Sequence, residues 1–319
     1  MECSRPGFRI HWETVGVSGA EPLLLVAGMG EQIGSVEFPD EHCALFAKRG
    51  FRVVRMDNRD NGLSLPDEAG DATASSLQPT LSYSQLDMAD DAAAVIDAVG
   101  AASAHVVGAS MGGYIARWLA VRHPDKVASL TVVMSGSGAD PGDSGPQIAA
   151  EVSRRVYDSN AFRRERDEAI ATTVEKWRWL WADHYPFEEE WVTERVTSAH
   201  DRSYRPEGVA RNILAFRGAP GLWEAQTGIR CPTLVFHGDR DPIFPVEHAR
   251  ATAEKIPTAR LAIKTGMGHT MHRELWSEMV DAVTALAQEA TESVRSSWAG
   301  PRVVPASSMQ PGVSRPEGV

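Results

Sequence analysis

Residues 105–114 read His-Val-Val-Gly-Ala-Ser-Met-Gly-Gly-Tyr, a short β-branched run that leads into a Gly-x-Ser-x-Gly motif. A helical pattern follows the motif and stops before Pro124, which predicts a strand, a sharp turn and a helix in succession. In this setting a serine is held at a strained turn with its hydroxyl exposed at the end of a sheet. Gly108 and Gly112 lack a Cβ atom, so the strand and the helix can approach closely. We therefore expect Ser110 to be a nucleophile if the rest of the chain supplies its partners.

Short apolar runs alternate with helical patterns on both sides of the motif, as expected for an α/β fold with a mostly parallel, doubly wound sheet. Further strands are predicted at Phe8–Val15 (an edge strand), 22–27, 51–56, 128–134, 232–237 and 260–264, and helices at 38–49, 83–99, 247–255 and 274–292. From about Ile148 to Trp223 the pattern is helical, with no convincing strand. We predict a first core segment at 1–135, an inserted helical cap at 136–229, a second core segment at 230–292 and a disordered tail at 293–319.

The composition restricts the partners and the setting. The 319 residues carry a net charge of −11, which argues against nucleic acid or an anionic membrane surface as the main partner. Three widely spaced cysteines predict neither a disulfide framework nor a zinc site, and they favour a reducing cytoplasm. The N-terminus shows no secretory signal, and no apolar run is long enough to span a bilayer.

A serine nucleophile needs a general base, and the base needs an orienting carboxylate. The predicted strand at 232–237 runs into a loop that contains Asp241, and the next strand runs into a glycine turn followed by His269. Both side chains therefore follow the carboxyl ends of strands, in the chain order Ser, Asp, His. We prefer Asp241, which precedes a proline, to Asp239 as the acid.

Two other histidines compete with His269 for the role of base. His272 lies three residues further on, at the start of the last helix, and His237 lies at the end of a strand, where a packed histidine is expected. Cleavage of an acyl group also requires N–H donors for the developing oxyanion. We expect the backbone N–H groups of Met111 and Met29 in this role, with turns supplied by Gly28, Gly30, Gly108 and Gly112. The alternative is that the 28–30 turn merely ends a strand.

Five of the nine tryptophans lie in the predicted cap. Trp177, Trp181, Tyr185 and Trp191 are candidates for an apolar substrate pocket above Ser110, although packing within the cap is the simpler interpretation for most of these aromatic residues. The spacing of Trp177, Trp179 and Trp181 spreads them around a helix, so all three cannot face one pocket.

Other acidic segments favour structural roles. The polar stretch 57–64 is dense in side chains that hydrogen-bond their own backbone, and it predicts a structural loop beside the site. Asp87, Asp90 and Asp91 lie in a helical pattern that favours a solvated face over a metal site. We expect no metal and no cofactor.

These residues resemble the α/β-hydrolase superfamily from about Arg9 to Gln288, and within it the actinobacterial carboxylesterases of the aclacinomycin methylesterase type. The resemblance rests on four segments: 55–64 (Arg-Met-Asp-Asn-Arg-Asp-x-Gly-x-Ser), 104–113, 256–260 and 266–269. It implies Ser110, Asp241 and His269 as the triad and a helical cap from about Gly136 to Gly228. The chain has Ala27-Gly28 where many members of the superfamily have His-Gly, so the second oxyanion donor departs from the wider pattern.

The leading hypothesis is a cofactor-independent serine hydrolase that cleaves a small-molecule carboxylic ester with an apolar or aromatic group. A C–C bond hydrolase, a thioesterase or a cofactor-free perhydrolase would use the same triad. A non-hydrolytic ligand receptor or a biosynthetic cyclase is a further alternative that the intact triad makes less favourable.

Overall fold

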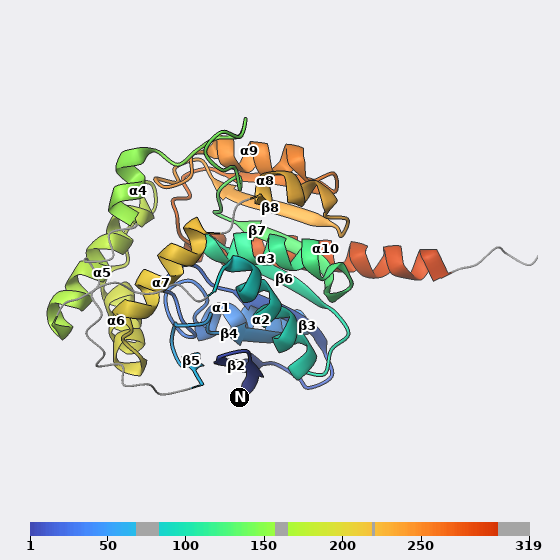
Figure 1. Cartoon of the computed structure of the whole chain (residues 1–319), viewed down its shortest axis with the longest axis horizontal. Helices are drawn as coiled ribbons and strands as arrows, with labels where there is room; N and C mark the ends of the chain where they lie inside the picture. The colour runs from blue at the N-terminus through green and yellow to red at the C-terminus, as the bar shows by residue number, and fades with distance from the viewer. Residues whose placement is uncertain (68–82, 157–164, 219–220, 299–319) are drawn as a thin grey trace, which may run out of the picture.

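A nine-stranded sheet forms the centre of the computed structural model, which describes residues 1–67, 83–156, 165–218 and 221–298 (Figure 1). Its strands are β1 Glu2–Arg5, β2 Phe8–Val15, β3 Glu21–Val26, β4 Phe51–Met56, β5 Leu65–Pro66, β6 Ala104–Ala109, β7 Val127–Val133, β8 Thr233–Gly238 and β9 Ala259–Lys264. The order in the sheet is β1-β2-β4-β3-β6-β7-β8-β9, with β5 paired to β2. The six strands from β4 to β9 along this order are parallel, which confirms the predicted mostly parallel α/β sheet.

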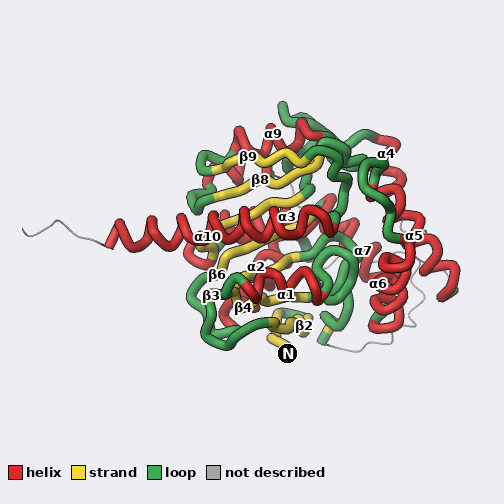
Figure 2. Tube along the Cα trace, turned by 180° about the vertical axis from the view of Figure 1, so that it is seen from behind, coloured by secondary structure: helices red, strands yellow, loops and turns green. Residues whose placement is uncertain are grey.

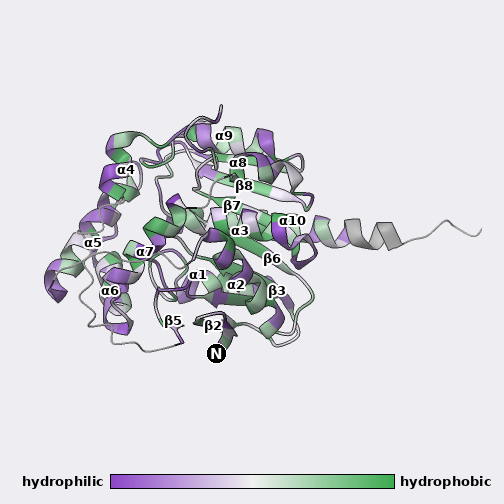
Figure 3. Cartoon of the chain, in the orientation of Figure 1, coloured by the Kyte–Doolittle hydropathy of each residue, from purple (hydrophilic) through white to green (hydrophobic). Residues whose placement is uncertain are grey.

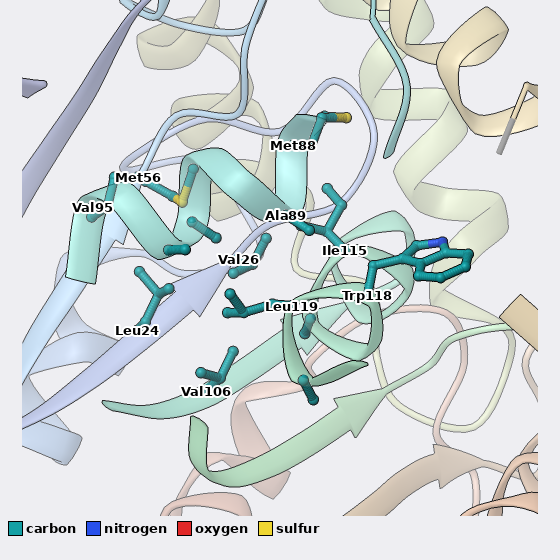
Figure 4. Close-up of a cluster of buried hydrophobic side chains, with 14 of the residues drawn as sticks. Leu24, Val26, Met56, Met88, Ala89, Val95, Val106, Ile115, Trp118 and Leu119 are labelled. Carbon is teal, nitrogen blue, oxygen red and sulfur yellow. The ribbon is translucent and has the colours of Figure 1, made fainter. Parts of the chain in front are cut away.

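Helices cover both faces of the sheet. They are α1 Asp40–Lys48, α2 Gln85–Ala98, α3 Met111–Arg122, α9 Val246–Lys255 and α10 Trp276–Trp298. Alternate residues of β3 belong to different cores: Leu24 and Val26 pack with α2 and α3, whereas Leu23 and Leu25 pack with α1 and α10. Figure 4 shows the first of these cores. The continuous apolar run of β3 thus follows from burial on both faces of the sheet.

The expectation that Phe8–Val15 is an edge strand is wrong. β2 pairs with β1 on one side and with β4 and β5 on the other, since Phe8 and Arg9 pair with both β1 and β5, so β1 is the edge. β1 alternates between exposed and half-buried residues and has only four residues, so it carries little apolar signal. Its pairing depends on the turn at Gly7, whose φ is +73°.

The last helix is longer than predicted. α10 continues to Trp298, six residues into the segment 293–319 that we expected to be disordered. Gly300 and Pro301 are the first residues after position 292 of a type that stops helices. The sequence therefore gives no reason for the helix to end at 292, where we predicted its end. The rest of the expected tail, 299–319, lies outside the described residues.

The chain between β7 and β8 contains α4 Ala150–Val156, α5 Arg166–Trp181, α6 Glu189–Arg202, α7 Pro206–Arg217, α8 Leu222–Ala225 and a 3-10 turn at Gln226–Gly228. Helices α4 to α7 lie together at one end of the sheet, beyond its layers (Figures 1 and 2). In Figure 3 the central strands are mainly hydrophobic, whereas α5 and α6 carry long hydrophilic stretches. Their contacts, described below, are with loops that follow the carboxyl ends of parallel strands.

Candidate active site

Ser110 occupies the sharp turn between β6 and α3. Its φ of +53° and ψ of −118° are unusual for a residue with a side chain. A Cβ atom on Gly112 would lie 2.0 Å from the Val26 carbonyl oxygen, and one on Gly108 would lie 2.3 Å from the Gly112 carbonyl oxygen. The glycines of the motif are therefore required by close packing of the turn against β3 and α3.

The structure brings Ser110, His269 and Asp241 into one hydrogen-bonded chain. The His269 Nε2 atom lies 3.0 Å from Ser110 Oγ, and the His269 Nδ1 atom lies 2.8 Å from Asp241 Oδ2. The other carboxylate oxygen of Asp241 accepts the backbone N–H groups of Ile243 and Phe244 at 2.8 and 2.9 Å. The Asp241 carboxylate is thus held by its own loop, and the imidazole lies between it and the serine.

The surroundings of Asp241 favour its charged form. Burial alone would raise the pKa of this carboxyl group, but the contact with His269, the nearby ring of His237 and the backbone hydrogen bonds lower the pKa below its ordinary value. A carboxylate in this position fixes the imidazole with its Nδ1 proton toward the acid and leaves Nε2 free to accept a proton from Ser110.

Helix α5 helps to place His269. The His269 N–H donates to the Leu180 carbonyl oxygen at 2.7 Å, and a Cβ atom on Gly268 would lie 2.4 Å from the same oxygen. The end of α5 therefore packs directly on the turn that carries the histidine. No sequence pattern pointed to this contact, because Leu180 and His269 are far apart in the chain.

The competing residues have other partners. Asp239 Oδ1 accepts the Gly266 N–H at 2.7 Å and so joins two turns. The His272 ring accepts the Gly268 N–H and packs edge-on against Trp181. His237 Nε2 lies 2.7 Å from the Phe244 carbonyl oxygen and 3.6 Å from Asp241 Oδ2. Among the candidate acids and bases, Asp241 and His269 are therefore the two that form the hydrogen-bonded chain to Ser110.

The loop after β3, residues 27–30, lies beside Ser110 and is called the oxyanion loop below, after the role that the sequence predicts for it. A Cβ atom on Gly28 would lie 3.2 Å from Ser110 Cβ, and Gly30 has a φ of +78°. The Gly28 N–H donates to Glu37 Oε2 at 2.6 Å. Glu37 could not be predicted as a partner of this loop, since a carboxyl nine residues after a glycine turn forms no recognisable motif.

A cavity of about 100 Å³ lies between the oxyanion loop and the helices α5 to α7. Trp177 and Met29 are among its lining residues. The other aromatic candidates make specific contacts elsewhere: Trp181 donates to the Pro186 carbonyl oxygen, Tyr185 to the Thr265 carbonyl oxygen, and Trp191 to Glu41. The structure therefore places Trp177 at the cavity and uses the other three in packing between α5, α6 and the core.

The acidic loop 57–64 contacts the helical insertion. The buried Asp60 carboxylate accepts two hydrogen bonds from Arg211 of α7, and Asp57 pairs with Arg202 of α6 at 2.9 Å.

The expectation of a solvated face is wrong for Asp91, which is buried and paired with Arg59 through two hydrogen bonds of 2.6 Å. Tertiary contact with the 57–64 loop, invisible to helical periodicity, is the reason.

Within the described ranges, no group of three or more His, Cys, Asp and Glu side chains is arranged to hold a metal ion. None of the helices in this part of the chain is long and apolar enough to cross a membrane.

The model of the alpha/beta hydrolase fold family matches residues 21–274. The chain belongs to this family. As an α/β-hydrolase it is similar to rhodomycin D methylesterase DauP of Streptomyces sp. strain C5, with 29% identity over 88% of this chain and 95% of that protein. A 2-hydroxy-6-oxononadienedioate/2-hydroxy-6-oxononatrienedioate hydrolase of Burkholderia vietnamiensis is 26% identical over 85% of this chain and 89% of that protein.

Solved structures share the fold. The esterase RhEst1 from Rhodococcus sp. ECU1013 superposes with a TM-score of 0.70 and 22% identity, over 91% of this chain and 97% of that one. The enol-lactonase from Burkholderia xenovorans LB400 gives a TM-score of 0.68 and 22% identity, over 92% of this chain and all of that one. Both likenesses support the α/β-hydrolase architecture.

Proposed function

We propose that this protein cleaves a small-molecule carboxylic ester through an acyl-enzyme on Ser110, with His269 as general base and Asp241 as the orienting acid. Its class, a carboxylic ester hydrolase, follows from its family and from its methylesterase and esterase relatives. The observation that supports the proposal is the continuous chain of hydrogen bonds from Asp241 through His269 to Ser110.

The reaction follows from this arrangement. Ser110 Oγ attacks the ester carbonyl carbon as His269 Nε2 takes its proton, and the carbonyl oxygen becomes an oxyanion. The backbone N–H groups of Met111, at the start of α3, and of Met29 stabilise that charge. The imidazolium then gives its proton to the leaving alkoxide, and Asp241 stabilises the imidazolium. Water repeats the sequence on the acyl-enzyme and releases the acid.

The helices between β7 and β8 act in this proposal as a cap over the serine, and the cavity at Trp177 receives one apolar part of the substrate. This cavity reaches the oxyanion loop at Met29 and Gly30. The similarity to rhodomycin D methylesterases favours a methyl ester of a bulky aromatic acid as the first substrate class to test.

The test replaces the nucleophile. Ser110→Ala is expected to lower kcat for a methyl or aryl ester by about four orders of magnitude or more, because the acyl-enzyme cannot form. The matched control is Ser18→Ala, at an exposed serine, which should keep wild-type rates. Normal hydrolysis by Ser110→Ala would overturn the mechanism.

The relative that hydrolyses a 2-hydroxy-6-oxo dienedioate favours one second candidate, cleavage of a C–C bond by the same triad. Rates measured over a panel of methyl esters, thioesters and vinylogous diketones separate the two. A fluorophosphonate probe should label Ser110 in either case. A folded protein that fails to label would favour a non-hydrolytic receptor or cyclase.

A further inference from the structure

The oxyanion loop is fixed by a buried acid. The Gly28 N–H donates to Glu37 Oε2 at 2.6 Å, and a Cβ atom on Gly28 would meet both Glu37 Oε1, at 2.6 Å, and Ser110 Cβ. Gly28 is therefore in contact with the acid on one side and with the serine on the other. Glu37 is only 3% exposed and lies in the segment between the loop and α1.

A second carboxyl group, Glu31, lies in the same segment and is 8% exposed. Burial raises the pKa of Glu31 as well, but three donors oppose this rise: the Ser35 hydroxyl, at 2.6 Å from Glu31 Oε2, and the backbone N–H groups of Val36 and Glu37. Glu37 has one such donor, the Gly28 N–H. Two neighbouring carboxyl groups with unequal numbers of donors separate into an anion and a neutral acid.

Burial and the charge of Glu31 favour the neutral form of Glu37. Burial raises the pKa of Glu37 well above its ordinary value, and the Glu31 charge raises it further, whereas the Gly28 N–H and Lys176 of α5 oppose this. His42 of α1 lies against the backbone of Glu37, and burial holds the His42 ring neutral by lowering its pKa to about 3. Glu31 keeps more donors, so Glu37 is the member of the pair that stays protonated.

We propose that Glu37, as the neutral acid, is a positioning residue that holds the Gly28–Met29 peptide and thereby aims the Met29 N–H at the reacting carbonyl oxygen. This inference rests on the proposed function. The carbonyl oxygen of the neutral carboxyl accepts the Gly28 N–H without bringing a charge to the loop. Ionised Glu37 would place a negative charge beside the site where the oxyanion develops, and would oppose it.

The inference predicts a pH dependence with a definite sign. The active form holds the Glu37 proton, so activity falls on the alkaline side as Glu37 ionises. Removing the Glu31 charge lowers the Glu37 pKa, so the fall should begin at lower pH in Glu31→Gln. Glu37→Gln keeps an acceptor oxygen and cannot ionise, so its kcat should fall by no more than about fivefold and its alkaline fall should disappear.

The experiment measures kcat and KM from pH 5 to 9.5 for the wild type, Glu37→Gln, Glu37→Ala and Glu31→Gln. Glu37→Ala removes the acceptor and should lower kcat by about 10- to 100-fold with KM changed by less than about threefold. Glu254→Gln, at an exposed carboxyl on α9, is the matched control and should keep the wild-type profile.

Fluorophosphonate labelling of Ser110 in each variant separates the two proposals. A wild-type alkaline fall that persists unchanged in Glu37→Gln, or a wild-type kcat in Glu37→Ala, would overturn the role of Glu37 while labelled Ser110 leaves the nucleophile intact. Full activity in Ser110→Ala would instead overturn the proposed function itself.

Discussion

At the scale of single residues, the fold buries several ionisable side chains, and their surroundings determine whether each one is charged. Asp241 keeps its charge because His269 and two backbone N–H groups compensate for burial. For His42, burial outweighs the one opposing contact, with the Glu37 backbone. Its ring is fully buried and stacks on Trp276, with centroids 4.7 Å apart and planes within 3°. It therefore stays neutral in the folded protein.

This neutrality makes folding sensitive to acid. Burial lowers the folded-state pKa of His42 to about 3, whereas the unfolded chain binds a proton near pH 6.5. Between these values the unfolded state holds more protons, so stability is lost as pH falls below 6.5, at about 1.4 kcal/mol per pH unit from this residue. In His42→Phe the loss of unfolding free energy between pH 7.5 and 5.0 should shrink by about 2 kcal/mol.

Urea titrations at the two pH values measure this difference. Burial also lowers the pKa values of His248 and His272 to about 4, so part of the acid sensitivity should remain in His42→Phe. His184→Gln, at an exposed histidine, is the control. An equal acid loss in His42→Phe and the wild type would contradict the assignment.

At the scale of elements, the site depends on how closely β3, β6 and α3 approach one another. β3 pairs with β6 through Val26 and Gly108, so the oxyanion loop and the serine turn leave the sheet side by side. Gly112, in the first turn of α3, lies against the carbonyl oxygens of Val26 and Ala27. The closeness of this packing determines the distance between the loop and Ser110.

Gly112→Ala tests this packing. Alanine favours helices, but here its Cβ would lie 2.0 Å from the Val26 carbonyl oxygen, so the backbone must shift. We expect a loss of unfolding free energy of about 2 kcal/mol or more, together with a lower kcat because the oxyanion loop is displaced. Urea unfolding and ester hydrolysis measure the two effects.

The control is Gly228→Ala, where a Cβ would meet no atom within 4 Å. Its stability should change by less than about 0.5 kcal/mol. If Gly112→Ala unfolded at the same urea concentration as this control, the close contact would not limit the position of α3.

At the scale of the whole molecule, the helices inserted between β7 and β8 are joined to the sheet by buried polar contacts. Arg211 donates to both oxygens of Asp60 at 2.8 and 2.6 Å, and the Asn212 amide contacts Asn61 and the Tyr83 hydroxyl. A Cβ atom on Gly208 would lie 2.0 Å from the Asp60 carbonyl oxygen. α7 is thereby placed against the loop that follows β4.

Arg211→Met should weaken this attachment. The Asp60 carboxylate, whose side chain is fully buried, would lose its cation, at a cost of about 2 kcal/mol since Arg211 is itself a quarter exposed. Urea unfolding measures the loss, and limited proteolysis should cut the helices 166–217 faster. Arg166→Met is the matched control: Arg166 makes the same paired contact with Asp201 on the surface and should leave the urea midpoint unchanged.

Much of the architecture could be predicted from the sequence because it depends on local patterns. Periodicity located the strands from β3 to β9 other than the two-residue β5, and the motif located the turn at Ser110. The roles of Asp91 and Glu37 could not be predicted from local patterns. Each is a carboxyl in an ordinary local pattern whose role depends on a partner brought close by the fold, Arg59 in one case and the Gly28 N–H in the other. The edge position of β1 likewise depends on pairing rather than on its own four residues.

For this chain, the family and the candidate residues could be read from the sequence, since chain order, turn glycines and strand ends are properties of neighbouring residues. The distances from Asp241 through His269 to Ser110 emerge only when three loops meet at one end of the sheet. The same holds for the contact of Leu180 with His269 and for the protonation of Glu37. Those properties depend on dielectric surroundings and on atoms far apart in the chain, and folding alone brings such atoms together.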